Sequence, residues 1–324
     1  MSTRRIFTIA TLAVALVTAA TAQTSAASEH GSEPAVVHNT WSSGAPMPLA
    51  VKFSMAAVLA GKIYVVGGVT DTAVVANTQI YDPVANSWST GTPLPTTTCG
   101  AAAAVVKNVL YLFGGSTDGK TQTNAVWAYN MKTKTWSAKA AMPTARSSVG
   151  VAVYKNIIYV VGGYANGRSD VVESYNPATD TWTEESPLLV GKSEPSVGLV
   201  GTTIVAAGGY DISGDTGDNE AYNVSTNSWK SLANEPTGRN ASCTGSTGGQ
   251  LYVAGGGNTS GNAVANNESF RLTKNKWTIQ AAMPLAAADP ASAVYKGQLY
   301  CFGGGSFTVQ FEGSVYNNVQ IYQP

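Results

Sequence analysis

A six-fold internal repeat runs from Trp41 to the end of the chain and constrains the fold more than any other feature. Tryptophans recur at intervals of 46 to 48 residues, and a glycine pair recurs with the same period. The repeating tryptophans are Trp41, Trp88, Trp136, Trp182, Trp229 and Trp277, and the pairs begin at Gly67, Gly114, Gly162, Gly208, Gly255 and Gly303. Self-similarity at ~50 residues with glycine and aromatic markers is typical of radially arranged four-stranded blades. The sequence therefore predicts an all-β, six-bladed β-propeller.

Each repeat contains the same local signals. A short apolar run such as KIYVV or VLYLF precedes every glycine pair. Runs of this length, rich in β-branched and aromatic residues and closed by glycine, are typical of buried strands. A later strand ends in an aromatic residue, and in five repeats a tryptophan follows it by seven positions, as Trp88 follows Tyr81. Asn, Asp, Pro and Ser fill the interval, as a turn between strands requires.

The two ends of the repeat region complement each other. The last repeat stops at Pro324, two residues after Tyr322, without a tryptophan strand, whereas the segment around Trp41 has no blade before it. An open row of blades would expose two sheet edges that invite aggregation. We therefore expect the Trp41 strand to complete the sixth blade as its outer strand and so close the ring.

This pattern of an apolar run, a glycine pair, an aromatic residue and a tryptophan resembles the kelch-repeat family. The resemblance covers Trp41 to Tyr322 and implies a propeller. It does not imply one activity, since a single fold hosts unrelated functions.

The N-terminus resembles an export signal. Arg4 and Arg5 precede an apolar stretch, and small residues follow at positions 20–22. We therefore expect a signal peptide at 1–22, a flexible linker at 23–39 and the propeller at 40–324, in a secreted or periplasmic protein. The apolar stretch is shorter than the ~20 residues that span a bilayer, so we expect no membrane span after cleavage.

Composition narrows the partners. Charged residues make up 12% of the chain, and no basic stripe is present, so a nucleic-acid partner is not expected. Only two histidines occur, His30 and His38, and both precede the first propeller strand. A histidine-based triad or histidine-ligated metal within the ring is therefore excluded. No nucleotide-binding glycine motif is present, and we expect neither a cofactor nor a metal.

The three cysteines do not form an evident disulfide framework. Cys99, Cys243 and Cys301 fall in three different repeats. We expect Cys301 to be a small buried apolar residue. A bridge from Cys243 to Cys301 across neighbouring blades is the less favoured alternative.

The segment before each innermost strand offers candidate binding residues. Sixteen residues before each glycine pair stand Val51, Thr98, Arg146, Lys192, Arg239 and Ala287. The resemblance to kelch repeats extends to the Pro-x-x-Arg that ends at Arg146 and Arg239. We hypothesise that Arg146, Lys192 and Arg239 line one mouth of the channel and bind an anionic group, because arginine suits bidentate capture of a carboxylate. The alternative is that these cations tie loops to neighbouring carboxylates or carbonyls.

Three further residues belong to this candidate ligand site. Glu194 and Asp289 stand two positions after Lys192 and Ala287, which on a strand places them on the same face. Lys52 is one step out of register. Asp211, Asp215, Asp218 and Glu220 form an acidic loop that either holds calcium or is a solvated turn, and its spacing does not fit the helix–loop–helix calcium pattern.

Two function classes follow. The favoured one is a recognition module, expected to be monomeric, that binds a glycan, a cell-envelope component or a protein at one mouth of the channel. The alternative is a carbohydrate-active enzyme. Glu194 and Asp289 could act as acid and base on a sugar, and the resemblance extends to exported kelch mutarotases that act on sialic acid, an acidic sugar.

Overall fold

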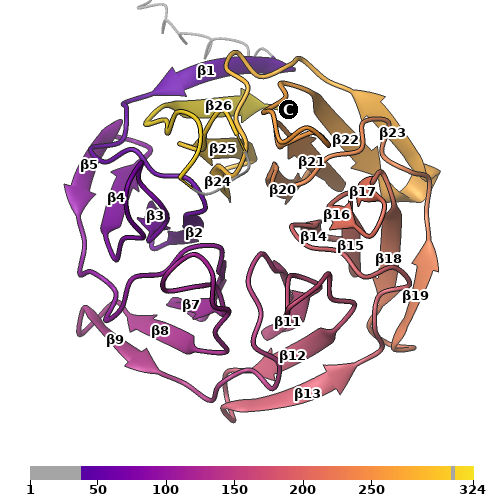
Figure 1. Ribbon diagram of the computed structural model, residues 1–324, viewed down its shortest axis with the longest axis horizontal. Helices are drawn as coiled ribbons and strands as arrows, with labels where there is room; N and C mark the ends of the chain where they lie inside the picture. Colours follow the sequence, from indigo (N-terminus) through magenta and orange to yellow (C-terminus); the bar gives the residue numbers. More distant parts are fainter. Residues whose placement is uncertain (1–37, 308–310) are drawn as a thin grey trace, which may run out of the picture. The chain divides into compact units, whose positions relative to one another are not determined.

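The strands of this computed structural model, which describes residues 38–307 and 311–324, form six four-stranded antiparallel sheets. Figure 1 shows these sheets arranged as blades around a common centre. The described residues also contain a two-stranded hairpin, β16 (Tyr210–Asp211) and β17 (Gly214–Asp215), and a 3-10 turn, η1 (Leu272–Lys274). The predicted six-bladed propeller is confirmed. The expected signal peptide and all but the last residues of the expected linker lie outside the described residues.

The four strands of each blade are ordered from the centre of the propeller to its rim. The innermost strands are β2 (Met55–Leu59), β6 (Ala102–Val106), β10 (Gly150–Tyr154), β14 (Ser196–Val200), β20 (Cys243–Thr247) and β24 (Ala291–Tyr295). The second strands are β3 (Lys62–Val66), β7 (Val109–Phe113), β11 (Ile157–Val161), β15 (Thr203–Ala207), β21 (Gln250–Ala254) and β25 (Gln298–Phe302). The third strands are β4 (Thr78–Asp82), β8 (Val126–Asn130), β12 (Val172–Asn176), β18 (Asn219–Asn223), β22 (Asn267–Arg271) and β26 (Val319–Gln323). The outer strands are β5 (Ser87–Thr90), β9 (Thr135–Ala138), β13 (Thr181–Glu185), β19 (Ser228–Ser231), β23 (Lys276–Ile279) and β1 (Thr40–Gly44).

The ring closes as the sequence predicts. Strand β1 pairs antiparallel with β26, and Trp41 lies opposite Tyr322. Asn39 adds to the closure, because its Oδ1 accepts hydrogen bonds from the Ala281 amide and the Tyr322 hydroxyl. The first and last described strands therefore belong to one sheet.

The seven-residue spacing from aromatic residue to tryptophan has a direct structural cause. Tyr81 and Trp88 lie opposite each other on β4 and β5, with ring centroids 5.0 Å apart. The indole N–H of Trp88 donates to the Ala45 carbonyl, 2.8 Å away, in the segment that joins this blade to the preceding one. The same pairing recurs in the other blades, so each tryptophan packs within its own blade and anchors the neighbouring connection.

The glycine pairs lie where neighbouring blades meet. Gly67 adopts a positive φ of 61°, and a Cβ there would lie 2.3 Å from the Thr98 carbonyl oxygen of the next blade. The following residue, Gly68, donates its amide to that same oxygen at 2.8 Å. Only glycine permits this conformation together with this approach. The acceptors of the six equivalent bonds are Val51, Thr98, Arg146, Lys192, Arg239 and Ala287, which we call the joint residues.

A disulfide joins blades five and six, which corrects the expectation for the cysteines. Cys243 on β20 and Cys301 on β25 are bonded, with their Cα atoms 5.7 Å apart. Their separation of 58 residues exceeds the repeat period. Cys243 therefore lies on the innermost strand of its blade, whereas Cys301 lies on the second strand of the next blade. Cys99 is buried and is not part of this disulfide.

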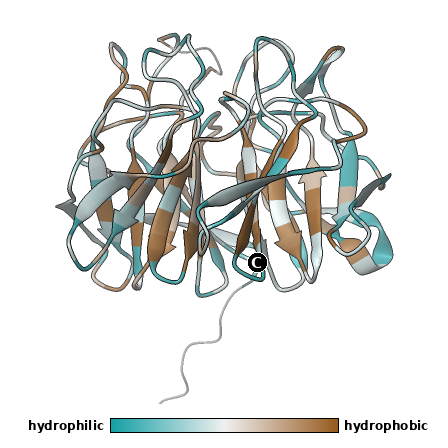
Figure 2. Ribbon diagram, turned by 90° about the horizontal axis from the view of Figure 1, so that it is seen from below, coloured by the Kyte–Doolittle hydropathy of each residue, from teal (hydrophilic) through white to brown (hydrophobic). Residues whose placement is uncertain are grey.

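The loops divide into two kinds on the two faces of the ring. Figure 2 shows apolar strands between short turns on one side and longer loops on the other. The longer loops follow the glycine pairs and connect second to third strands; we call this side the loop face. Among the described residues, no helix is long and apolar enough to cross a membrane.

Candidate functional site

Six residues form a belt around the mouth of the channel on the loop face. They stand two positions after the joint residues and are Phe53, Gly100, Ser148, Glu194, Ala241 and Asp289, which we call the ring residues. All six have positive φ angles, between 51° and 61°. Five backbone hydrogen bonds of 2.6 to 3.0 Å connect them head to tail around the described belt. Because these five bonds occupy most of the backbone amides and carbonyls of the ring residues, specificity at the mouth depends mainly on their side chains.

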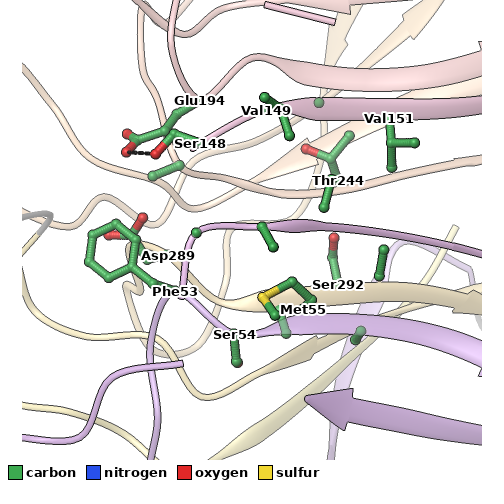
Figure 3. A pocket seen from close by; sticks show the side chains of 18 of the residues that line it. Phe53, Ser54, Met55, Ser148, Val149, Val151, Glu194, Thr244, Asp289 and Ser292 are labelled. Carbon is green, nitrogen blue, oxygen red and sulfur yellow. Dashed lines mark hydrogen bonds between the residues drawn. The ribbon is translucent and has the colours of Figure 1, made fainter. Parts of the chain in front are cut away.

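The ring residues line a cavity of about 260 Å³ that leads into the centre of the propeller. Below the belt its walls are small or apolar side chains from the innermost strands, among them Met55, Val151, Thr244 and Ser292. In Figure 3 Glu194 and Ser148 lie on one side of the mouth, with Asp289 and Phe53 on the other. Glu194 and Asp289 are the ionisable side chains among the described lining residues. The sequence thus identified two residues of this cavity.

Glu194 is a partly exposed carboxylate with a neutral neighbour. Its Oε1 accepts a hydrogen bond from the Ser148 hydroxyl at 3.1 Å. Burial raises the pKa of Glu194 to about 7, and the negative charge of Asp215 acts in the same direction, while the Ser148 hydrogen bond opposes both. Glu194 can therefore give or accept a proton near neutral pH.

Asp289 is more deeply buried, at 7% exposure. Burial raises its pKa well above the ordinary value; Glu194 adds to this effect and the positive charge of Lys52 opposes it. Its Oδ2 atom is buried and accepts no hydrogen bond from the described residues. A buried acceptor without a donor is costly, so this oxygen is poised to accept a hydrogen bond from a ligand.

Two features of these carboxylates differ from the sequence expectation. They precede β14 and β24 rather than lying on a strand face, since their backbones have left-handed φ angles of 55°. Lys52, expected beside them, is fully buried. Its ammonium donates to the carbonyls of Phe307, at 3.1 Å, and Glu312, at 2.7 Å. Lys52 therefore holds the loop between β25 and β26 instead of lining the cavity.

The three cations predicted to form a cationic mouth lie elsewhere. Arg146 is fully buried; its guanidinium donates to Glu173 on the third strand at 2.7 Å and to the carbonyls of Gly162 and Val171. It does not belong to the lining of the cavity. Because the joint carbonyls must reach the preceding blade, their side chains turn back into their own blade. Arg146 therefore has the contacts of the structural alternative, a cation that ties a loop to a carboxylate.

Lys192 and Arg239 have equivalent environments. Lys192 pairs with Asp218 and, at 2.9 Å, with Glu220, and Arg239 pairs with Glu235 at 2.5 Å and with Glu268 at 3.0 Å. Both cations are at most 1% exposed. Neither side chain lines the cavity. The two groups that were expected to bind an anionic ligand are therefore engaged inside their own blades.

The acidic loop is divided among different contacts. Asp218 and Glu220 pair with Lys192, whereas Asp211 accepts from the Ser213 amide and Asp215 from the Asn240 side chain. Within the described residues no group of three or more potential ligands could hold a metal ion. The four acidic side chains therefore serve the hairpin and the blade rather than one common centre.

A second cavity, of about 380 Å³, lies on the loop face between blades four and five. Tyr210 and Phe307 line it together with polar side chains such as Asn258 and Thr259. The exposed Arg168 lies over the Tyr210 ring, 4.4 Å from its centroid. Glu194 lines this cavity as well as the central one. Sequence reasoning missed Tyr210, because the position after the glycine pair recurs in every repeat but carries a tyrosine in only two of them, at 164 and 210.

The comparisons with known proteins agree with this architecture. The Kelch motif matches residues 56–95, 97–143, 145–189, 192–234 and 238–284. The chain belongs to the kelch family. The solved structure of YjhT resembles this chain with a TM-score of 0.73 and 17% identity, covering 86% of this chain and 96% of that one. At this identity the likeness concerns the fold alone, and no curated protein matches the sequence.

Proposed function

We propose that this kelch propeller is a recognition protein that binds a glycan on its loop face. One sugar unit occupies the mouth of the channel against the ring residues, and the chain continues into the cleft that Tyr210 and Phe307 line. We further propose that it acts outside the cytoplasm, as a secreted or periplasmic monomer, because its N-terminus has the pattern of an export signal.

The observation that carries this proposal is the position of Glu194 between two cavities. A carboxylate that lines both the 260 Å³ and the 380 Å³ spaces can contact two consecutive units of an extended ligand. The surroundings combine aromatic faces with hydroxyl and amide groups, which suit the apolar faces and hydroxyl groups of sugars.

A glycan array with the mature protein tests the proposal, followed by titration of the glycans it retains. Tyr210→Ala removes an aromatic face of the cleft and should weaken binding by roughly 10-fold. Tyr164→Ala is the matched control, because Tyr164 is exposed on the same face and lines neither cavity. Equal affinities of the Tyr210→Ala variant and the unaltered protein, or no retained glycan at all, would contradict the proposal.

A second candidate function is sugar mutarotation. Its supporting observation is the pair of carboxylates with raised pKa values in one cavity, since perturbed groups of this kind are candidates for acid–base chemistry. One carboxylate would take the proton of the anomeric hydroxyl while the other protonated the ring oxygen, opening the ring for reclosure on either face. Exchange NMR on acidic, neutral and amino sugars tests this candidate, and rates equal to the uncatalysed ones would exclude it.

A further inference from the structure

The channel mouth has an unbalanced charge. Glu194 and Asp289 line it, and neither forms a salt bridge within the described residues. The joint cations, two residues away along the chain, are all paired with carboxylates of their own blades. Among its described lining residues the cavity thus contains two carboxylates and no cationic side chain, and the positive charge of Lys52 acts on Asp289 from outside this lining.

Asp289 shows where a donor is needed. It is nine-tenths buried, lines the cavity, and leaves its Oδ2 without a hydrogen-bond donor among the described residues. Buried polar atoms are normally paired, and an unpaired one in a cavity is satisfied by a ligand or a water molecule.

The small side chain of Ala241 leaves room for such a donor. Ala241 lies between Glu194 and Asp289 in the belt, because it is the ring residue of blade five and they are those of blades four and six. A group that enters above Ala241 faces both carboxylates. Phe53, which lies beside Asp289 in Figure 3, adds an aromatic ring, and the ammonium of Lys52 already lies 5.9 Å from its centroid.

We propose that the channel mouth binds a protonated primary amine carried by an amino sugar, held between Asp289 and Glu194. This inference rests on the proposed function and specifies the sugar that the mouth accepts. An ammonium group supplies three donors and a positive charge, which match the unpaired oxygen of Asp289 and two carboxyl groups that form no salt bridge among the described residues. The hydroxyl of Ser148 remains bound to Glu194 and orients it.

Binding of this kind is coupled to proton release. The empty mouth retains protons at neutral pH because burial raises the pKa values of Glu194, to about 7, and of Asp289. An ammonium group favours the ionised carboxylates, so affinity rises as the pH approaches the pKa of Glu194, about 7, and falls again once the amine of the sugar loses its own proton. Three charged neighbours on the surrounding elements act on this site. The positive charge of Lys52 acts on Asp289, and the negative charge of Asp215 acts on Glu194. Asp118, together with Asp289, acts on the buried Cys99. Lys52 lowers the pKa of Asp289, whereas Asp215 raises that of Glu194. Cys99 stays neutral because burial raises its pKa to about 12.

Calorimetric titration with a β-1,4-linked glucosamine trimer and its N-acetylated counterpart tests the inference. The free amine should bind at least ~10-fold more tightly, with proton uptake by the buffer, and Asp289→Asn and Glu194→Gln should each remove most of the difference. Asparagine tolerates the left-handed backbone at 289, so that variant should fold. Asp170→Asn, an exposed change on the loop face, is the control.

A gain of positive charge provides an independent variant. Ala241→Lys places a tethered ammonium between the carboxylates, and lysine is tolerated at such a φ angle, as at Lys155. This variant should lose binding of the glucosamine trimer, while Ala241→Gln retains most of it.

The outcomes separate this inference from the proposed function. Equal affinity for the free and acetylated trimers, or an amine preference that survives both Asp289→Asn and Glu194→Gln, overturns the inference and leaves glycan recognition standing. Retention of other glycans but neither trimer has the same meaning. Absence of every glycan from the mouth overturns both.

Discussion

The joint residues and the ring residues are two positions apart in every repeat, yet their charged side chains have opposite surroundings. In blades three to five the joint residue is a cation, and each one meets a glutamate on its own third strand: Glu173, Glu220 or Glu268. The ring carboxylates Glu194 and Asp289 meet no cation that pairs with them in the described residues. A charged side chain that pairs within its own blade stabilises the fold. A carboxyl group at the channel that forms no salt bridge is available to a ligand.

The other blades show what replaces an ion pair at the joint. In blade one the joint residue is Val51, and the third strand carries Gln79, whose side chain hydrogen-bonds the amide and carbonyl of Leu49. In blade six Gln320 binds the backbone of Leu285 in the same way. In blades one and six a neutral side chain thus organises the loop, whereas blade two has Trp127 at this position, and its indole N–H has no acceptor among the described residues.

The largest expected effect comes from breaking one joint. Arg146→Val leaves Glu173 buried without its cation and should lower the free energy of unfolding by about 3–5 kcal/mol. Adding Glu173→Gln copies the arrangement of blade one and should restore stability to within about 1–2 kcal/mol. Urea denaturation of the single and double variants measures both. A double variant as unstable as the single one would contradict the ion-pair account.

The second effect concerns the disulfide, which belongs to the frame rather than to the site. Replacing Cys243 and Cys301 by alanine should reduce the free energy of unfolding by about 2–4 kcal/mol, because the bridge closes a long loop. Denaturation under non-reducing conditions measures the loss. Ligand affinity should stay unchanged, and a weakened affinity would place the bridge in the site.

The third effect is a pH dependence of the ring. The pKa of Glu194 is raised to about 7, so the folded state holds this proton more tightly than the unfolded state. Its contribution to stability is complete below the ordinary pKa and is lost as the pH rises through 7. Glu194→Gln should therefore be more stable than the unaltered protein at pH 8, by about 1–3 kcal/mol, and should not be at pH 4.5.

Thermal unfolding at both pH values measures this difference. The comparison with the unaltered protein is needed because Asp215 and Glu235 have raised pKa values too, about 6 and 8. These groups also make the free energy of unfolding fall as the pH rises. A constant difference across the pH range would contradict the assignment.

The smallest effect concerns closure of the ring. Asn39→Gly keeps the left-handed backbone and removes the side chain that binds Ala281 and Tyr322, so we expect a loss of about 0.5–1.5 kcal/mol. Asn227→Gly, which removes the equivalent bonds to the Ser186 amide and the Tyr222 hydroxyl inside the ring, is the matched control. Similar losses would show that the closing blade is as firmly held as an internal one, and a much larger loss at Asn39 would show that it is not.

The repeat made the fold predictable from the sequence. Pairs of tyrosine or phenylalanine with tryptophan, and close approaches at glycine, recur in every blade because each blade packs on its neighbour in the same way. The same physical requirement therefore appears six times in the sequence. The closure by Trp41 followed from the same pattern.

The site was less predictable because it depends on differences between the repeats. The spacing located the equivalent positions of Arg146 and Glu194, but it did not show that two residues separate a buried side chain from one at the cavity. That distinction comes from the left-handed turn at each ring residue, which non-glycine residues adopt here without a sequence marker. The disulfide was only the less favoured alternative for a related reason, since its cysteines occupy different positions in their repeats.

Ligand titration of two variants, each compared with the unaltered protein, tests the central claim most directly. One variant is Glu194→Gln/Asp289→Asn in the ring, and the other is Arg146→Val/Glu173→Gln at a joint. With a glycan retained on the array, we predict that the ring variant loses at least ~10-fold in affinity while the joint variant binds as the unaltered protein does. Loss of binding in the joint variant, with the ring variant unaffected, would contradict the account.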